Sequence, residues 1–446
     1  MRMAAPCSSA TIGHMNATPE ETSKRRVVIA GGGVAGLELV LALHALAGDR
    51  LDVTLVSPDE EFAYRPLSVA EPFGLGEVRR YDAASLVAEH GASFEFGYLE
   101  RVDSERRVVM LSGARELAYD DLVIALGADR RPVYREALTF IDQRSTPGYR
   151  DLLSGIERGE ISSLAFVVPS GPVWPFPLYE LALMTATFAS EHDREVKITV
   201  ATPATAPLAL FGEAARDAMT AMLADRGIKV YGGQDIEVHD RHRALLTPDG
   251  PAIQADRIVA LPRLYGPSIS GLPHDRDGFI PVDEHGRVDG TPGVWAAGDC
   301  TTFPVKQGGI ASQQADVVAA AIAADAGADV EAPPFTPVLR GVLLTGGDPN
   351  WLRADMANGS VQAPAVSQTA LWWPPTKVAG RYLAPALGTI DDSTTLENPG
   401  VGVPVEVRLE TAPADHPRVH RRALIARARG TAEPQMIDFG PGGHGL

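Results

Sequence analysis

The chain has 446 residues, enough for two or three domains with cores of their own. Hydrophobic residues make up 45% and charged residues 22%, as is typical of globular proteins, and a formal net charge of -17 argues against general nucleic-acid binding. No apolar run approaches the roughly 18 residues of a membrane-spanning helix. Cys7 and Cys300 are the only cysteines, which excludes a disulfide framework and a C-x-x-C zinc site. We therefore predict a reducing compartment, the cytoplasm, and no metal site.

The first 24 residues are predicted to form a flexible leader. They contain no apolar segment of the kind found in signal peptides, and Met15 is an alternative start.

A glycine-rich turn follows, between a predicted strand at 26–30 and a predicted helix at 34–47. Gly31, Gly33 and Gly36 fit the G-x-G-x-x-G pattern. The first glycine allows a tight turn, the second lets a pyrophosphate approach the backbone, and the third lets the helix pack closely on the strand. The N–H groups at the helix start would bind the phosphates. The pattern predicts a dinucleotide site, with a glycine-rich turn of another α/β protein as the alternative.

The second predicted strand, 51–56, ends where such a site usually has an acidic residue for the ribose hydroxyls. Ser57 stands there, so we expect a weaker serine contact or a contact from Asp59. Tyr64 and Arg65 follow in a loop that either lines the cofactor or is an ordinary surface loop.

The predicted elements from 83 to 128 complete a first α/β unit, and those from 164 to 231 form a second unit of the same kind. The first unit has a predicted helix at 83–90, antiparallel strands at 94–103, 108–111 and 116–119, and a buried strand at 121–128. The second unit has predicted strands at 164–168, 196–201 and 228–231, and helices at 176–190 and 213–226. The repeat indicates a second Rossmann-like domain.

The turn at 169–177 occupies the position of the glycine motif in the second unit, but it lacks the glycines. Its four prolines remove backbone N–H donors that would bind a pyrophosphate, and Trp174 and Phe176 would fill the space. The strand at 196–201 also ends without an acidic residue. We therefore predict a nicotinamide-binding fold without its ligand.

A hairpin is predicted around 279–288. A second strong motif follows it, in which an apolar strand ends in Gly298 and Asp299 and a predicted helix at 307–324 begins shortly after. An aspartate in this position is suited to polyol hydroxyls. The helix start at Gly308 and Gly309 can face an electron-rich ring oxygen. The alternative is an ordinary strand–loop–helix with a capping aspartate.

The C-terminal part begins with a proline-rich linker and a predicted strand at 338–344. Trp372 and Trp373 could cover a ring cofactor, form an interface or belong to a small core. The tail from Glu397 includes a basic segment, 418–429, which is either a membrane-surface helix or a solvated face.

In this order, the glycine motif, the segment 119–128 and the segment 294–299 resemble the two-dinucleotide-domain FAD oxidoreductases, over about residues 25–330. Within that superfamily the chain is most similar to the group of sulfide:quinone oxidoreductases, flavocytochrome c sulfide dehydrogenases and type II NADH dehydrogenases. The similarity lies in 62–67, Thr202-Pro203, 210–212 and Gln313-Gln314.

This resemblance implies an α/β fold with two Rossmann-like, three-layer domains and a small C-terminal domain. The expected boundaries are 25–145 with 270–330 for the FAD-binding domain, 146–269 for the degenerate NAD-binding-like domain, and 331–446 for the C-terminal domain and tail. FAD is the implied cofactor. The residues expected to bind it are Gly31, Gly33, Val34, Ala35, Gly36, Ser57, Pro58, Arg65, Val102, Ala125, Gly127, Gly298, Asp299, Lys306, Gly308 and Gly309.

The departures from the family pattern restrict the chemistry. The catalytic cysteine of sulfide-oxidising relatives would fall near Trp174, so a persulfide mechanism is not expected. Residues 62–73 contain no cysteine to link the flavin, and the second glycine motif of type II NADH dehydrogenases is missing. Their Ala-Gln pair appears here as Gly308-Gly309, although Gln313 matches a later glutamine.

The sequence thus predicts non-covalently bound FAD that passes electrons from an unidentified non-nicotinamide donor to an acceptor such as a quinone. Lys306 is expected near the pyrimidine end of the flavin, and Trp174 and Tyr179 are expected to shape the substrate pocket. Two alternatives remain, an NAD(P)H:quinone-type reductase and a non-catalytic flavoprotein that serves as an electron-transfer or binding subunit. A small-molecule redox substrate is expected, with membrane contact at most peripheral, and a homodimer is left open.

Overall fold

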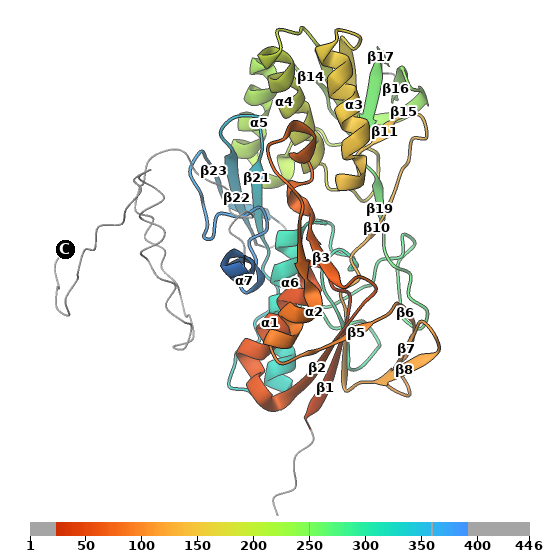
Figure 1. Ribbon diagram of the computed structural model, residues 1–446, viewed down its shortest axis with the longest axis vertical. Coiled ribbons are helices and arrows are strands. Elements are labelled where there is room, and N and C mark those ends of the chain that lie inside the picture. The colour runs from red at the N-terminus through yellow and green to blue at the C-terminus, as the bar shows by residue number, and fades with distance from the viewer. Residues whose placement is uncertain (1–23, 249, 358–359, 391–446) are drawn as a thin grey trace, which may run out of the picture.

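The computed structural model describes residues 24–248, 250–357 and 360–390 (Figure 1). The predictions for the leader before Lys24 and for the tail from Glu397, including the basic segment 418–429, lie outside the described residues. The described chain forms an α/β protein in which two parallel sheets lie at opposite ends and a small antiparallel sheet lies beside them.

The first sheet is parallel and buried on both faces. Its strands, in spatial order, are β20 (Val294–Ala296), β9 (Asp121–Ile124), β1 (Arg25–Ala30), β2 (Leu51–Ser57) and β5 (Ser93–Phe96). Val27 and Ile29 pack under the helices α1 (Val34–Ala47) and α6 (Gly308–Asp325), whereas Val28 and Ala30 face the opposite layer. A run of apolar residues with side chains alternating between two covered faces is what a buried parallel strand requires.

The opposite layer of this sheet is an antiparallel meander. It consists of β6 (Leu99–Asp103), β7 (Val108–Leu111) and β8 (Arg115–Ala118). The prediction of one strand over 94–103 was wrong, because the chain breaks at Gly97, whose N–H donates to the carbonyl of Ser57 (3.0 Å). The residues before the break form β5 in the parallel sheet, and those after it form β6. The predicted helix at 83–90 is confirmed as α2 (Ala83–Glu89).

The second sheet repeats the three-layer plan. Its parallel strands are β11 (Leu138–Thr139), β18 (Arg257–Ala260), β12 (Ser163–Val167), β13 (Lys197–Ala201) and β14 (Lys229–Tyr231). One face is covered by α3 (Thr146–Glu157), α4 (Phe176–Glu191) and α5 (Glu213–Asp225), and the other by β15 (Asp235–Asp240), β16 (Arg243–Thr247) and β17 (Ala252–Gln254). The predicted fold class, with two Rossmann-like units, is confirmed.

Two short antiparallel pairs lie outside the two parallel sheets. They are β3 (Glu61–Tyr64) with β4 (Arg79–Asp82), and β10 (Asp129–Arg131) with β19 (Arg263–Tyr265). The second pair lies where the chain passes between the two parallel sheets (Figure 1). The hairpin expected around 279–288 is reduced to a single antiparallel bridge between Val282 and Val288.

The C-terminal part forms a three-stranded antiparallel sheet and a short helix. These elements are β21 (Val338–Leu343), β22 (Asn350–Ala357), β23 (Ser360–Ser367) and α7 (Leu383–Ile390), and α7 packs on α1. Trp372 packs against the buried Trp351 with 4.6 Å between ring centroids, whereas Trp373 is 53% exposed. Trp372 therefore belongs to a small core.

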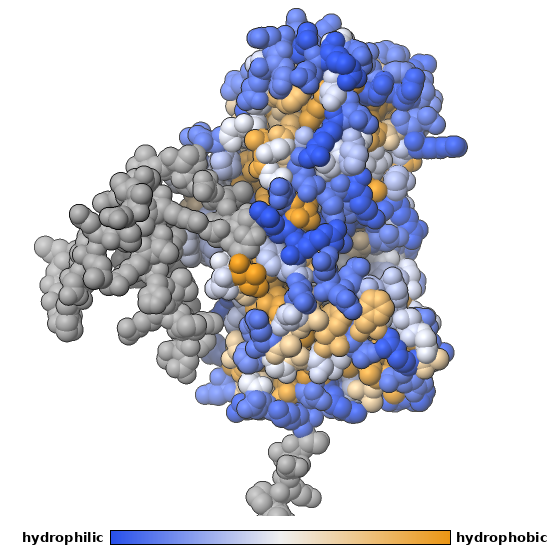
Figure 2. Space-filling model, in the orientation of Figure 1, coloured by the Kyte–Doolittle hydropathy of each residue, from blue (hydrophilic) through white to orange (hydrophobic). Residues whose placement is uncertain are grey.

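The face shown in Figure 2 is largely hydrophilic, with apolar atoms exposed near α7, where Ile390 is among the exposed large side chains. Within the described residues, no helix has both the length and the apolar character that a membrane span requires.

Candidate functional site

A cavity of about 450 Å³ opens at the carboxyl ends of the strands of the first sheet. This is the edge at which doubly wound sheets bind their ligands. The unit around the first sheet, the unit around the second sheet and the C-terminal part all contribute residues to its wall. The predicted cofactor-binding residues that line it are Gly31, Gly33, Val34, Ala35, Ser57, Pro58, Arg65, Ala125, Gly127, Gly298, Asp299, Lys306 and Gly308.

The glycine motif forms the inner end of the cavity, where β1 turns into α1. A Cβ on Gly31 would lie 2.3 Å from the carbonyl oxygen of Ala125, and one on Gly36 would lie 1.8 Å from the carbonyl oxygen of Gly31. Both positions exclude a side chain because backbone passes close by. A Cβ on Gly33 would meet nothing within 4 Å, so this glycine leaves open space at the helix N-terminus. That is the space in which a pyrophosphate would lie.

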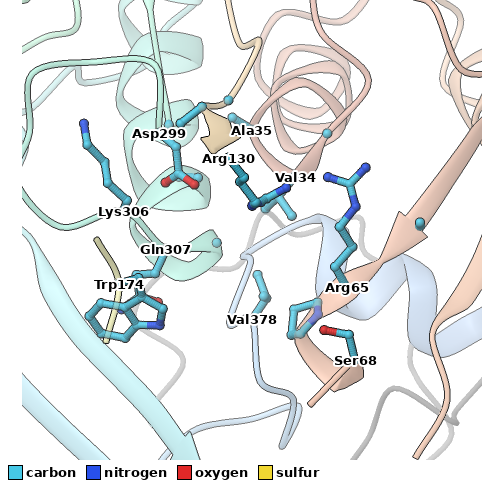
Figure 3. Close-up of a pocket in the computed structure, with 18 of the residues that line it drawn as sticks. Val34, Ala35, Arg65, Ser68, Arg130, Trp174, Asp299, Lys306, Gln307 and Val378 are labelled. Carbon is cyan, nitrogen blue, oxygen red and sulfur yellow. The ribbon is translucent and has the colours of Figure 1, made fainter. Parts of the chain in front are cut away.

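Two arginines supply positive charge beside this space. Arg65 follows β3, and Arg130 lies in β10, next to the end of β9. Figure 3 shows the Arg130 side chain between Asp299 and Val34, and Arg65 on the side of the cavity away from Asp299. Arg130 makes no hydrogen bond or ion pair to any described residue, so its guanidinium remains available for a phosphate. The sequence analysis did not single out Arg130, because only the fold brings β10 to the glycine motif.

Ser57 ends β2 and lines the cavity, and its contact with a ribose stays a prediction. Its hydroxyl donates to the carbonyl of Asp59 (2.9 Å) and accepts from the N–H of Asp59 (3.2 Å). The serine therefore orders its own loop, and both residues line the cavity.

The Gly298–Asp299 turn lies across the cavity from Arg65, held in place by α6. The N–H of Gly298 donates to Oε1 of Gln314 (2.7 Å). The Asp299 carboxyl makes no hydrogen bond to any described residue, and burial raises its pKa, with Arg130 and Lys306 acting in the opposite direction. A partly exposed carboxyl without protein donors is suited to accept hydrogen bonds from a polyol chain.

Lys306 is nearly fully buried at the same side of the cavity (Figure 3). Its Nζ donates to the carbonyl of Thr301 and lies 3.8 Å from the centroid of the Phe279 ring. Burial lowers the pKa of Lys306 from 10.5 to about 8, although Asp299 attracts its positive charge. Lys306 therefore loses its positive charge at a lower pH than an exposed lysine does. Its contact with the flavin stays a prediction.

Lys306→Met is expected to remove a pH dependence of stability. Between pH 8 and 10.5 the folded protein binds fewer protons at Lys306 than the unfolded chain does, so the free energy of unfolding rises with pH across this window. The shift corresponds to a rise on the order of 3 kcal/mol. The measurement is the apparent unfolding midpoint against pH, with the exposed Lys197→Met as the control. A rise that persists unchanged in the Lys306→Met protein would contradict the assignment.

Four predicted residues do not line the cavity. Gly309 donates its N–H to Oε1 of Gln307 (3.2 Å), and Gly36 packs on Gly31. Val102 is a buried residue of β6, and its N–H donates to the carbonyl of Ser270 (2.9 Å). Cofactor contacts from these three residues stay predictions. Tyr179 was expected to shape the substrate pocket, but it is fully buried in the core around α4. The next residue of the helix, Glu180, lines the cavity instead.

The outer end of the cavity is apolar on one side. Trp174 and Phe176 stack with 5.5 Å between centroids and 3° between ring planes, and both line the cavity. Phe211 packs behind them. Trp174 thus lines the cavity, and its role in shaping a substrate pocket stays a prediction.

A buried ion pair stands beside these rings. Nζ of Lys377 lies 2.6 Å from Oε1 of Glu180, and that oxygen also accepts from the N–H of Leu344 (2.9 Å). The two side chains are 7% and 2% exposed. Burial raises the pKa of Glu180, and Lys377 opposes the shift. The pair provides a proton-carrying group that the sequence did not reveal, since charged residues so far apart in the chain give no local signal.

The second nucleotide turn is filled by the protein itself. A Cβ on Gly171 would lie 2.7 Å from Nε of Arg263, whose Nη2 is 2.8 Å from Oδ1 of Asp277. Pro175 and Pro177 at the start of α4 carry no N–H, and the N–H of Leu178 donates to the carbonyl of Pro175 (3.0 Å). The helix N-terminus therefore offers little to an anion.

The structure also contains one group of potential metal ligands among its described residues. Asp283, Glu284 and His285 lie within reach of one ion, but they are consecutive residues of a surface turn. They lie outside the cavity.

Comparison with known proteins identifies the family. Residues 25–323, more than half of the chain, match the model of the pyridine nucleotide-disulphide oxidoreductases. The chain is 27% identical to putidaredoxin reductase of Pseudomonas putida over 297 residues, covering 62% of this chain and 67% of the relative. Its fold is similar to that of the sulfide:quinone oxidoreductase of Aquifex aeolicus, with a TM-score of 0.68, 19% identity, and 77% and 86% of the two chains covered. It is also similar to Plasmodium falciparum NDH2, solved with NADH, with a TM-score of 0.59, 14% identity, and 84% and 95% covered.

The chain belongs to the pyridine nucleotide-disulphide oxidoreductase family. It is an FAD-dependent oxidoreductase, as the motifs predicted. The residues present fit this cofactor, because the open space at Gly33, the free guanidinium of Arg130 and the unpartnered carboxyl of Asp299 suit a pyrophosphate and a polyol.

Proposed function

We propose that this chain binds FAD non-covalently in the cavity and passes electrons from a non-nicotinamide donor to an acceptor such as a quinone. The flavin supplies the redox chemistry when bound, and the protein determines which molecules reach it. The turn around Gly33 would hold the pyrophosphate together with Arg130 and Arg65. Asp299 would hold the ribityl hydroxyls, and Ser57 with Asp59 would contact the ribose.

The filled second turn is the observation that carries the choice of donor. A nicotinamide dinucleotide needs a glycine turn and helix N–H groups for its pyrophosphate. Here the Arg263 guanidinium lies against Gly171, and prolines replace donors at the start of α4. Opening the turn would require breaking the 2.8 Å ion pair between Arg263 and Asp277.

The outer end of the cavity supports the choice of acceptor. A quinone has an apolar ring, so its pocket needs an apolar wall. It takes up two electrons and two protons to become a quinol, so the pocket also needs a proton source. Trp174 and Phe176 provide the wall. Glu180 carries a proton more readily than an ordinary glutamate because burial raises its pKa, and Lys377 is hydrogen-bonded to it.

The acceptor is tested by reducing the flavoprotein photochemically without oxygen and then adding a soluble quinone. We expect rapid reoxidation, seen as the return of the flavin absorbance. A protein that quinones leave reduced, but that a co-purified protein partner reoxidises, would instead support the electron-transfer subunit.

A cytoplasmic location, peripheral membrane contact and a homodimer stay predictions.

Nucleotide binding provides a separate test of the second domain. Titration calorimetry with NADH and with NADPH is expected to show no saturable binding in the wild-type protein. Tight binding of either would favour the NAD(P)H:quinone-type reductase.

A further inference from the structure

A buried carboxylate on the glycine-motif helix anchors a distant part of the chain. Glu38 in α1 is fully buried. Its Oε1 accepts from the N–H of Tyr382 (2.7 Å) and its Oε2 from the N–H of Leu383 (2.9 Å), at the start of α7. A Cβ on Gly380 would lie 2.5 Å from the same Oε2, so the backbone before α7 runs directly against the carboxylate.

A second carboxyl lies against the first. Asp316 of α6 interacts with Glu38, and its Oδ1 is buried without a hydrogen-bond partner among the described residues. Two ionised carboxylates in one buried site repel each other, so such a pair holds a proton more tightly than an isolated carboxyl does. Burial accordingly raises the pKa of both groups, and that of Asp316 strongly, although Arg381 and Arg340 oppose the shift at Asp316.

The anchored segment reaches the cavity wall a few residues earlier in the chain. The N–H of Val378 donates to the hydroxyl of Tyr64 (3.1 Å), and its side chain packs at Gly308, where a Cβ would lie 2.8 Å from Cγ2. Lys377 makes the ion pair with Glu180. The segment 377–383 therefore connects the buried carboxyls to Lys377 and Val378, which both line the cavity.

We propose that Glu38 and Asp316 are positioning residues, which share one proton and in that state clamp the backbone before α7, so that Lys377 and Val378 stay in the cavity wall. The charged and titratable groups that face the pair are Arg381 and Tyr382 of the clamped segment and Arg340 of β21. Loss of the shared proton, as the pH rises through the raised pKa of the pair, leaves two adjacent negative charges and loosens the clamp. The consequence for electron transfer rests on the proposed function, whereas the clamp itself does not.

Hydrogen–deuterium exchange of the intact flavoprotein tests the clamp, followed on peptides covering 376–390 and corrected for the intrinsic effect of pH. In the wild-type protein, exchange in this segment is expected to speed up as the pH rises through the raised pKa of the pair. Asp316→Asn keeps a donor facing Glu38 but cannot ionise, so its protection is expected to persist there. Glu38→Gln retains one acceptor for two N–H groups, and exchange about tenfold faster is expected at every pH. The exposed Asp329→Asn should behave as wild type.

Unchanged exchange over 376–390 in Glu38→Gln, or equal pH dependence in Asp316→Asn and wild type, would overturn the clamp. Faster exchange in Glu38→Gln with an unchanged rate of quinone reoxidation would overturn the positioning of Lys377 and Val378. Failure of the proposed function is distinguishable, because the wild-type protein itself would then not be reoxidised by quinone.

Discussion

Gly33→Val is expected to yield a folded protein that contains no flavin. The Gly33 backbone has φ -88°, which any residue adopts, and a Cβ there meets no protein atom within 4 Å. The new side chain would project into the space that the pyrophosphate needs, so the clash falls on the cofactor and not on the fold. Flavin released from the purified protein is expected to drop from about one per chain to none, with an unchanged far-ultraviolet circular dichroism spectrum.

A matched glycine serves as the control. Gly388 lies in α7, outside the cavity, and a Cβ there also meets nothing within 4 Å. Gly388→Val should retain its flavin. A Gly33→Val protein that still binds one FAD would show that the cofactor lies elsewhere.

The second large effect is expected for Glu180→Gln. This change keeps the size of the side chain but removes the group that carries a proton beside Trp174 and Phe176. Loss of a general acid costs roughly 100- to 10,000-fold in rate, so reoxidation of the reduced protein by quinone should slow by that factor. Because the acid must be protonated, the wild-type rate should fall as pH rises through the raised pKa of Glu180. The rate of the variant should not show this fall.

Stopped-flow absorbance under anaerobic conditions measures both rates. Glu191→Gln, at the exposed end of the same helix, is the control and should react as wild type. Flavin content and the unfolding midpoint of Glu180→Gln establish that it is intact. Reoxidation of an intact Glu180→Gln protein at the wild-type rate would remove Glu180 from the proposed chemistry.

The sequence predicted those parts of the fold that local patterns determine. The glycine motif, the buried strands and the helices follow from runs of apolar residues and from turns, so their limits differ from the structure by only a few residues in most cases. The strand at 94–103 failed because Gly97 ends one strand and lets the next join another sheet. Apolar alternation alone does not distinguish two such strands from one.

The parts that the sequence did not predict depend on contacts between distant segments. Glu180 and Lys377 are 197 positions apart in the sequence. Both are of residue types that usually lie at the surface, but the fold buries both side chains. Arg263 lies against Gly171 although the two residues are far apart in the sequence. Sequence spacing also placed Tyr179 in the pocket, although helix geometry directs Glu180 there instead.

Anaerobic mixing with NADH and NADPH tests the central claim most directly. The flavin absorbance of the wild-type protein is followed in a stopped-flow instrument after each nucleotide is added in excess, and photochemical reduction of the same sample shows that its flavin is competent. The filled turn at Gly171 predicts that neither nucleotide reduces the flavin on the time scale of turnover, while photoreduction is complete. Rapid bleaching by either nucleotide would contradict a non-nicotinamide donor.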